Sequence, residues 1–160
     1  MIQEVIKLGV IGGSGLYHMD DLENIDIFDI DTPFGKPSTP VTAGMIDGFP
    51  IGFIARHGKG HTIPPTYVNY RANIYALKAL GAEKVLGISA CGSLREDYTP
   101  GEIVIADQLV DFTKKRENSY FGKGLSAHIG VADPFCQLFS EQVFSAAKGT
   151  EASVKLGGLL

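Results

Sequence analysis

The fold is decided by the stretch VIKLGVIGGSG at residues 5–15. Its apolar and β-branched residues at 5–11 predict a buried strand, and the glycines that follow end that strand. Consecutive backbone N–H groups in a Gly-rich bend can converge on an anion, and the hydroxyl of Ser14 adds one more donor. The spacing fits neither a dinucleotide fingerprint nor a P-loop, because the third glycine position falls at His18 and no Gly-Lys-Ser/Thr follows. A simple tight turn remains the alternative.

Further strands and a helix follow this opening strand. Apolar or alternating runs predict strands at residues 25–30, 41–46, 51–55 and 84–89. Asp47-Gly48 predicts a hairpin turn between two of them. A proline pair before Thr66 and a glycine at Gly81 delimit a helix over 66–81, whose two apolar stripes predict burial on most sides. Strand, helix and strand in this order indicate an α/β domain with a mixed central β-sheet flanked by helices.

The last third of the chain predicts one more helix and a loop. Strand-like runs lie at 101–106, 108–112 and 152–160. Residues 114–126 are polar and Gly-rich, which indicates a mobile loop, and Asp133-Pro134 predicts the start of a helix that ends at Gly149. The sequence stops on an apolar strand, so we expect more protein to follow it. We expect residues 1–160 to form a single α/β domain, truncated at its C-terminus.

Composition excludes several classes of protein. The 160 residues hold 14 Lys and Arg against 18 Asp and Glu, a formal charge of −4. This mild acidity argues against broad binding to nucleic acid or to an anionic membrane. Apolar residues make up 44%, and no apolar run has the roughly 18 residues that a spanning helix needs. The N-terminus shows no basic region of a signal peptide, so we expect a cytoplasmic protein.

The two cysteines do not point to chemistry. Cys91 and Cys136 fit no Cys-x-x-Cys metal or redox spacing and cannot form a disulfide framework. They are read as small buried hydrophobic residues. Glycine is the informative residue type, since 20 of the 160 residues are Gly and most of them sit at the ends of apolar runs. Such places bring backbone close to a ligand.

Two further bends carry candidate site residues. RHGKGH at 56–61 follows a predicted strand, and the fork of Arg56 matches the geometry of phosphate, with His57 beside it. SACGS at 89–93 closes another strand. Since ligands of open α/β sheets lie beyond the carboxyl ends of strands, we expect Ser14, Arg56, His57 and Ser89 to surround one anion.

The weaker candidate site residues have simpler interpretations. His57 and His61 are four residues apart, but the intervening glycines disfavour a helix and no carboxylate is near, so no metal site is expected. His128 reads as a loop residue, and the basic run 114–116 as a solvated face.

Five motifs in this order resemble the methylthioadenosine phosphorylase branch of the trimeric purine nucleoside phosphorylases. They are GGSGL at 12–16, RHG at 56–58 with His61, VNYRAN at 68–73, SACGSLRE at 89–96 and DPFC at 133–136. The resemblance covers the whole chain but only the N-terminal part of that family's fold. It implies a pentosyltransferase in which phosphate attacks C1′ of a purine nucleoside, most simply 5′-methylthioadenosine. Phosphate is then a co-substrate, and no other cofactor is implied.

The resemblance also implies roles for residues. The position of Ser14 lies in the family's phosphate loop, Arg56 and His57 match residues that hold the phosphate, and Ser89 with the backbone of Ala90 completes that shell. His61 matches a position near the ribose and the phosphate. His128 matches a histidine that a neighbouring subunit lends to the 5′ side of the ribose. A homotrimer or a dimer of trimers is therefore implied.

This sequence departs from the family's pattern, and these departures leave alternative functions open. The family's segments for base recognition lie in its second half and are not in this sequence, so a preference for aminopurine or for 6-oxopurine and methylthioinosine is not decided. An inactive phosphate-binding fragment is a further alternative. Arg-His-Gly is also a signature of histidine phosphatases, but there it follows the first strand and the histidine is the nucleophile, whereas here it begins at Arg56 after about four strands.

Overall fold

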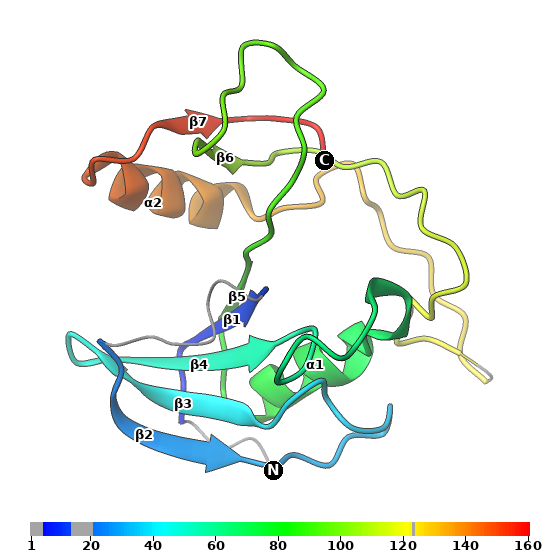
Figure 1. Ribbon diagram of the computed structural model, residues 1–160. Coiled ribbons are helices and arrows are strands. Elements are labelled where there is room, and N and C mark those ends of the chain that lie inside the picture. The colour runs from blue at the N-terminus through cyan, green and yellow to red at the C-terminus, as the bar shows by residue number, and fades with distance from the viewer. Residues whose placement is uncertain (1–4, 14–20, 123) are drawn as a thin grey trace. The chain divides into compact units, whose positions relative to one another are not determined.

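The computed structural model describes residues 5–13, 21–122 and 124–160 (Figure 1). The chain divides into two compact units. The first comprises residues 1–90 and 115–120, and the second comprises 91–114 and 121–160. The expectation of one domain over 1–160 stays a prediction.

The first unit is built on a five-stranded mixed sheet in the order β2-β3-β4-β1-β5. Its strands are β1 (Leu8–Gly12), β2 (Glu23–Phe28), β3 (Val41–Ile46), β4 (Phe49–Ala55) and β5 (Lys84–Gly87). β1 lies between β4 and β5 and pairs with both in parallel, while β2-β3 and β3-β4 pair antiparallel. The predicted mixed α/β sheet is therefore confirmed, with strand bounds within a few residues of those expected.

The predicted hairpin turn is also confirmed. Asp47 and Gly48 connect β3 to β4, with φ of 49° and 74°. Two consecutive residues with positive φ match the twist of the flanking strands, and Asp-Gly tolerates that conformation best. This turn sets the register in which Ile46 faces Phe49.

The helix of the first unit is shorter than expected. A 3₁₀ turn spans Pro65–Tyr67, and α1 (Tyr70–Ala79) begins only after Asn69, whose side chain accepts from the Ala72 N–H as an N-cap. Burial on most sides was wrong, since Tyr67 is 78% exposed and Ile74 40% exposed.

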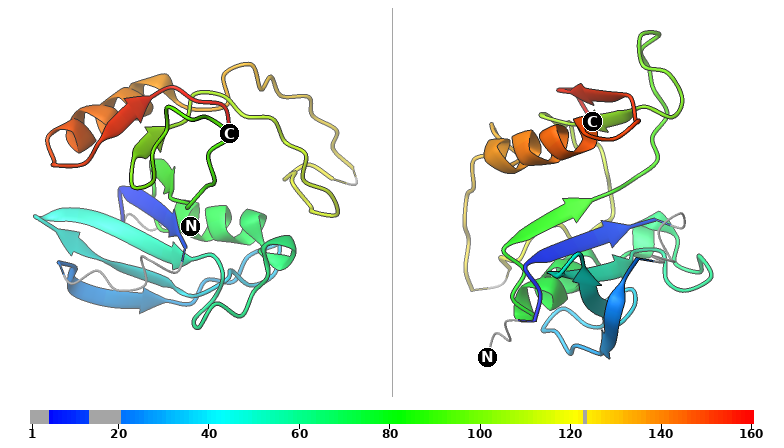
Figure 2. Two further views of the ribbon diagram at one scale, coloured as in Figure 1. Left: turned by 45° about the horizontal axis from the view of Figure 1, so that its top comes forward. Right: turned by 90° about the vertical axis from the view of Figure 1, so that its left-hand side faces the viewer.

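α1 packs against one face of the sheet, as Figure 2 shows. Leu77 is fully buried there, close enough to Gly9 of β1 that a Cβ on Gly9 would lie 2.7 Å from a Leu77 methyl carbon. The opposite face of the sheet carries a second apolar cluster of Val10, Ile51, Phe53 and Ala55. Because successive residues of a strand point to opposite faces, β1 contributes Ile11 to one cluster and Val10 to the other. The parallel strands are thus the rigid centre of the unit.

Two asparagines of the VNYRAN segment attach a loop to α1. Asn69 donates to the Phe34 carbonyl at 2.6 Å, and Asn73, fully buried, accepts from Ser38 N at 2.8 Å and donates to Ser38 Oγ at 3.0 Å. The amide of Asn73 therefore satisfies both the backbone and the side chain of Ser38. This segment stabilises the approach to β3.

Replacing Asn73 by alanine is expected to lower the free energy of unfolding by about 1–3 kcal/mol, because the Ser38 N–H would lose its acceptor. Urea unfolding followed by circular dichroism measures this. Asn118→Ala, at an exposed position, is the control and should stay within about 0.5 kcal/mol of the parent. Equal effects of the two changes would contradict a structural role for Asn73.

Residues 115–120, part of the predicted mobile loop, belong to the first unit. Arg71 of α1 pairs with the Glu117 carboxylate and donates to the Ser119 carbonyl at 3.2 Å. The Tyr120 hydroxyl donates back to the Arg71 carbonyl at 2.9 Å. The segment has no helix or strand, but its polar contacts hold it against the start of α1.

The second unit is a β-α-β arrangement. β6 (Ile103–Ile105) and β7 (Val154–Leu156) pair in parallel and are connected through α2 (Gln137–Lys148). Two expectations were wrong. The helix begins after Cys136 rather than at Asp133-Pro134, and the run 108–112 forms only an isolated bridge from Gln108 to Leu159.

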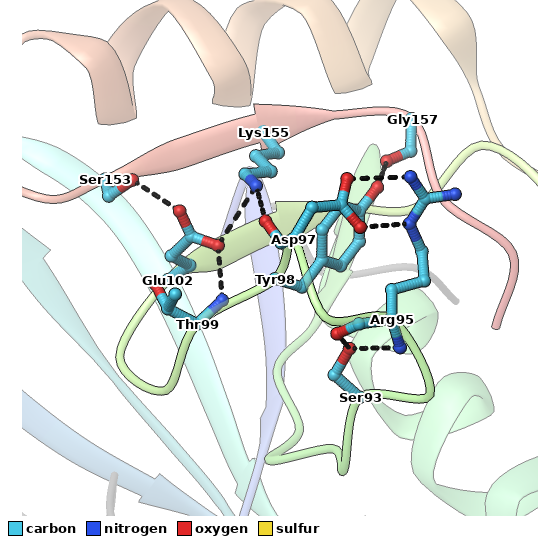
Figure 3. A network of polar contacts seen from close by, with 9 residues as sticks. All are labelled: Ser93, Arg95, Asp97, Tyr98, Thr99, Glu102, Ser153, Lys155 and Gly157. Carbon is cyan, nitrogen blue, oxygen red and sulfur yellow. Dashed lines mark hydrogen bonds and ion pairs between the residues drawn. The ribbon is translucent and has the colours of Figure 1, made fainter.

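A polar network joins the two strands of the second unit to the loop before them (Figure 3). The Glu102 carboxylate accepts from Thr99 N at 2.8 Å and from Ser153 Oγ at 2.9 Å, and it pairs with Lys155 Nζ at 3.3 Å. Lys155 also lies 4.6 Å from the ring centroid of Tyr98. The Thr99 N–H, then the Ser153 hydroxyl and then Lys155 lower the pKa of Glu102 below its ordinary value.

This lowered pKa predicts acid sensitivity of the second unit. A carboxyl group whose pKa is lower in the folded chain than in the unfolded chain stabilises the fold at pH values above its unfolded pKa. That contribution is lost as the pH falls through the pKa of the group in the folded chain. Hydrogen exchange should therefore show slower β6 and β7 amides than in Glu102→Gln at pH 7, with the difference shrinking at about pH 3. Glu151→Gln, at an exposed position, is the control. A difference that persists unchanged at low pH would contradict the prediction.

Two remaining expectations concern cysteines and membranes. Cys91 and Cys136 are exposed, so their reading as buried residues was wrong. Cys91 lies in the segment after β5, and Cys136 stands at the N-cap position of α2 without a side-chain capping hydrogen bond. Neither belongs to the two apolar clusters of the described residues. In the part of the chain that the structure describes, no helix is both long and apolar enough to span a bilayer.

Candidate active site

Three neighbouring strands deliver their following residues to one edge of the sheet. β4, β1 and β5 run in parallel side by side, so their carboxyl ends meet there. The ladder continues one step past the strands, since Arg56 N donates to the Gly12 carbonyl at 3.1 Å and Ile88 N to the Ile11 carbonyl at 3.0 Å. This edge is where open α/β sheets bind ligands. Short strands with fixed register thus place Gly13, Arg56 and Ser89 together.

The guanidinium of Arg56 is the centre of the site. Its Nη1 donates to the Ile88 carbonyl at 2.6 Å, its Nη2 donates to Ser89 Oγ at 2.9 Å, and its Nε donates to His57 Nε2 at 3.1 Å. A Cβ on Gly13 would lie 3.2 Å from Nη2. Gly13 therefore lets the backbone after β1 approach the guanidinium closely.

His57 is buried beside Arg56, with only 7% of its surface exposed. Its Nδ1 lies 2.9 Å from the Ile63 carbonyl, and its own carbonyl accepts from Ile63 N at 2.9 Å. These two contacts close the loop that follows β4. The imidazole is consequently held on both ring nitrogens, by Ile63 on one side and Arg56 on the other.

His61 lies against His57. The two ring centroids are 4.5 Å apart with planes tilted by 36°. His61 has φ of 58°, a left-handed conformation that is uncommon outside glycine, and Gly58 and Gly60 also have positive φ. The glycines of this motif thus turn the loop back so that the second histidine returns to the first.

The structure brings together some of the residues that the sequence predicts for the site. Arg56, His57 and Ser89 come together, His61 lies beside them, and Ala90 follows Ser89 directly. Ser14 lies outside the described residues. His128 is exposed in the second unit.

Sequence reasoning missed the backbone acceptors of the site. The carbonyls of Ile63 and Ile88 hold His57 and Arg56, yet a carbonyl group is common to every residue and leaves no signature in the sequence. Gly13 was singled out only as part of a bend, and its closeness to the guanidinium depends on the register between β1 and β4.

The arrangement is suited to holding an oxyanion. A guanidinium has five N–H donors and stays charged, and Arg56 uses three of these donors on protein acceptors among the described residues. Two N–H groups have no acceptor in the described ranges. A cation with its plane fixed by three partners and donors remaining is a preorganised receptor for phosphate.

Relatives of known name are similar to this chain over most of its length. The S-methyl-5′-thioadenosine phosphorylase of Hyperthermus butylicus is 49% identical over 141 residues, which cover 88% of this chain and 52% of the relative. That of Geobacter sulfurreducens is 48% identical over 152 residues, covering 94% of this chain and 53% of the relative. The chain thus spans about half the length of the curated relatives it matches.

Solved structures show the same fold. A methylthioadenosine phosphorylase from an antarctic soil metagenomic library superposes with a TM-score of 0.90 at 39% identity, covering 98% of this chain and 56% of the other. The methylthioadenosine phosphorylase of Schistosoma mansoni in complex with adenine gives a TM-score of 0.89 at 36% identity, covering 96% and 63%. The resemblance drawn from the five motifs is therefore confirmed. The family model described as "Phosphorylase superfamily" matches residues 7–159, nearly the whole chain, and the chain belongs to that superfamily.

Proposed function

We propose that this chain carries the phosphate-binding half of a 5′-methylthioadenosine phosphorylase. The reaction is phosphate plus 5′-methylthioadenosine to adenine plus 5-methylthioribose 1-phosphate. The observation that carries the proposal is the guanidinium of Arg56, which the parallel strands bring within hydrogen-bond distance of Ser89 and against Gly13. The names of the relatives supply the substrate class.

The chemistry requires positioning rather than a covalent nucleophile. As the bond from C1′ to the purine nitrogen breaks, the sugar gains the positive charge of an oxocarbenium ion, and a phosphate oxygen then bonds to C1′. Arg56 and Ser89 would hold the phosphate where its negative charge faces that developing positive charge. The electron pair of the broken bond leaves with the purine. No redox step occurs, so the reaction calls for no cofactor beyond phosphate.

His57, His61, Ser14, Ala90 and His128 keep their proposed roles at this site. His61 lies beside His57, which supports a place for it near the phosphate and ribose. His128 would act at the ribose of a neighbouring subunit, in a homotrimer or a dimer of trimers, and sedimentation velocity measures that assembly. The alternative function of a histidine phosphatase is not supported, because Arg-His-Gly follows β4 and the chain belongs to the phosphorylase superfamily.

The test separates phosphate binding from turnover. Titration calorimetry with inorganic phosphate measures the site itself, and release of adenine from 5′-methylthioadenosine measures the reaction. Hypoxanthine release from inosine is the comparison that reports base preference. Phosphate binding with adenine release supports the whole proposal, and binding without release marks a phosphate-binding fragment. Absence of phosphate binding would overturn the assignment of the site.

A further inference from the structure

The last backbone N–H of β4 that faces β3 belongs to Ala55. Arg56 N donates to the Gly12 carbonyl of β1 at 3.1 Å, and successive N–H groups of a strand point to opposite sides. The N–H of Ala55 therefore points away from β1, toward β3. Ala55 is only 8% exposed, so this group depends on a protein acceptor.

The ladder between β3 and β4 stops one step short of this N–H group. The two strands pair antiparallel in a register that places Thr42 opposite Phe53, and the same register places Pro40 opposite Ala55. Pro40 precedes the first residue of β3 and has no N–H, so it cannot complete a reciprocal pair of ladder hydrogen bonds. The Ala55 N–H donates instead to Thr39 Oγ1 at 3.3 Å. A side chain thus takes the place of one further ladder step.

The loop before β3 holds Thr39 in this position. Its neighbour Ser38 is bound by the fully buried Asn73 of α1, at 2.8 Å through the Ser38 N–H and at 3.0 Å through Oγ. Asn69, the N-cap of α1, donates to the carbonyl of Phe34 in the same loop at 2.6 Å. Thr39 is therefore anchored to α1 through the chain before it and to the sheet through the strand after it. An acceptor with both flanks fixed can determine where the end of β4 lies.

We propose that Thr39 is a positioning residue for the anion site and acts through the end of β4. The N–H groups of Ala55 and Arg56 are held on opposite sides, by Thr39 and by Gly12, so the peptide between them cannot rotate freely. Arg56 and His57 follow directly, and this peptide sets the direction in which their side chains leave the sheet. The inference rests on the proposed function, since Arg56 must bind phosphate for its position to matter.

The contacts of Arg56 show why the end of β4 must be fixed. Its Nη1 lies 2.6 Å from the Ile88 carbonyl and its Nη2 lies 2.9 Å from Ser89 Oγ, both after β5. These contacts cross from one strand end to another and require both backbones to keep their places. Without Thr39 Oγ1, the buried Ala55 N–H has to turn toward another acceptor or water, because an unsatisfied buried donor is costly. That rotation displaces the guanidinium, on whose plane a bidentate contact to phosphate depends.

Replacing Thr39 by valine tests this role, because valine keeps the branched shape and removes the acceptor. We expect Thr39→Val to weaken the affinity for inorganic phosphate about 3- to 10-fold in titration calorimetry, the size of one neutral hydrogen bond. Thr39→Ser keeps the hydroxyl and should bring the affinity back to within about twofold of the parent. A serine variant that binds as weakly as the valine variant would overturn the proposal.

Thr32→Val is the matched control, since it makes the same change in the same loop. Thr32 Oγ1 accepts from Phe34 N at 3.1 Å and donates to the Gly35 carbonyl at 2.5 Å, so these contacts remain within the loop. This variant should lower the midpoint of urea unfolding, as Thr39→Val does, but leave phosphate affinity within about twofold. Equal losses of affinity in the two valine variants would contradict the proposal, because destabilisation of the loop alone would then explain them.

Nitrogen NMR of the ¹⁵N-labelled chain follows the link from Thr39 to the guanidinium. In Thr39→Val we expect shifts of both the Ala55 amide signal and the Arg56 Nε–H signal, whereas in Thr32→Val neither should move. If the parent chain binds phosphate and the Arg56 signal stays in place in Thr39→Val, the positioning role alone is removed. Absence of phosphate binding by the parent would remove the proposed function, and the role of Thr39 would fall with it.

Discussion

Replacing Arg56 by alanine is expected to lower phosphate affinity, and any phosphorolysis of 5′-methylthioadenosine, by at least about 100-fold. Loss of a single preorganised donor at a developing charge costs roughly 10²–10³ in rate. This substitution removes a full charge together with the donors that remain for the anion. It also leaves Ser89 Oγ and the Ile88 carbonyl without their contacts to the guanidinium. Titration calorimetry with phosphate and an adenine-release assay measure the two effects.

Two companion variants separate charge from geometry. Arg56→Lys keeps the charge but loses the planar fork and the Nε–H contact to His57, so we expect it to behave more like alanine than like the parent. Lys59→Ala removes the same charge from an exposed position three residues along the loop and should leave phosphate affinity within about twofold. Near-normal binding by Arg56→Ala would refute the phosphate site.

The sequence predicted those site residues that lie at the carboxyl ends of predicted strands. Arg56, His57 and Ser89 each come directly after a predicted strand or close it, and parallel strands bring such positions together by geometry alone. The partners of these residues were not predictable. The carbonyls of Ile63 and Ile88 act through backbone that every residue has, and their positions depend on loop closure and strand register.

Strands were predicted better than helix boundaries, because the sequence signals that mark the strands are local. The strands carry β-branched runs bounded by glycine, and Asp47-Gly48 marks a turn by conformation alone. The start of α1 depends instead on Asn69, whose amide contacts the Phe34 carbonyl 35 residues earlier in the chain. Thr66, where the sequence predicts the helix to begin, lies instead in the 3₁₀ turn Pro65–Tyr67, and Asn69 caps α1.

The buried face of α1 was misjudged for a related reason. The two apolar stripes of residues 66–81 predict burial on most sides, yet Tyr67 and Ile74 are exposed. The polar Asn73 is fully buried because Ser38 supplies partners for its amide. A pattern based on hydrophobicity cannot rank a buried asparagine above an exposed isoleucine when the partner comes from a distant loop.

Replacing Leu77 by alanine is expected to give the largest loss of stability in the first unit, about 2–5 kcal/mol of the free energy of unfolding. The side chain is fully buried between α1 and the sheet, in the same apolar cluster as Ile11 of β1 and Ile54 of β4. Truncation removes apolar contacts and leaves a cavity that the surrounding rigid strands cannot fill. Urea unfolding measured by circular dichroism gives the change.

Ile74→Ala is the matched control, because it truncates a side chain of similar size on the same helix at a position that is 40% exposed. Its cost should be well under half that of Leu77→Ala, since little burial is lost and alanine favours the helix. Equal losses for the two variants would mean that α1 does not pack on β1 as described.

A double substitution makes the same prediction more specific. Gly9→Ala alone should destabilise the chain, since its Cβ would lie 2.7 Å from a Leu77 methyl carbon and the leucine would have to move. In Leu77→Ala that methyl is gone, so the added Cβ enters vacated space and replaces part of the lost contact. The double variant should therefore be more stable than the sum of the single losses predicts, with a coupling energy of roughly 0.5–3 kcal/mol. Simple additivity would show that Gly9 and Leu77 are not in contact, and the register that carries Arg56 to the sheet edge would then lack its support.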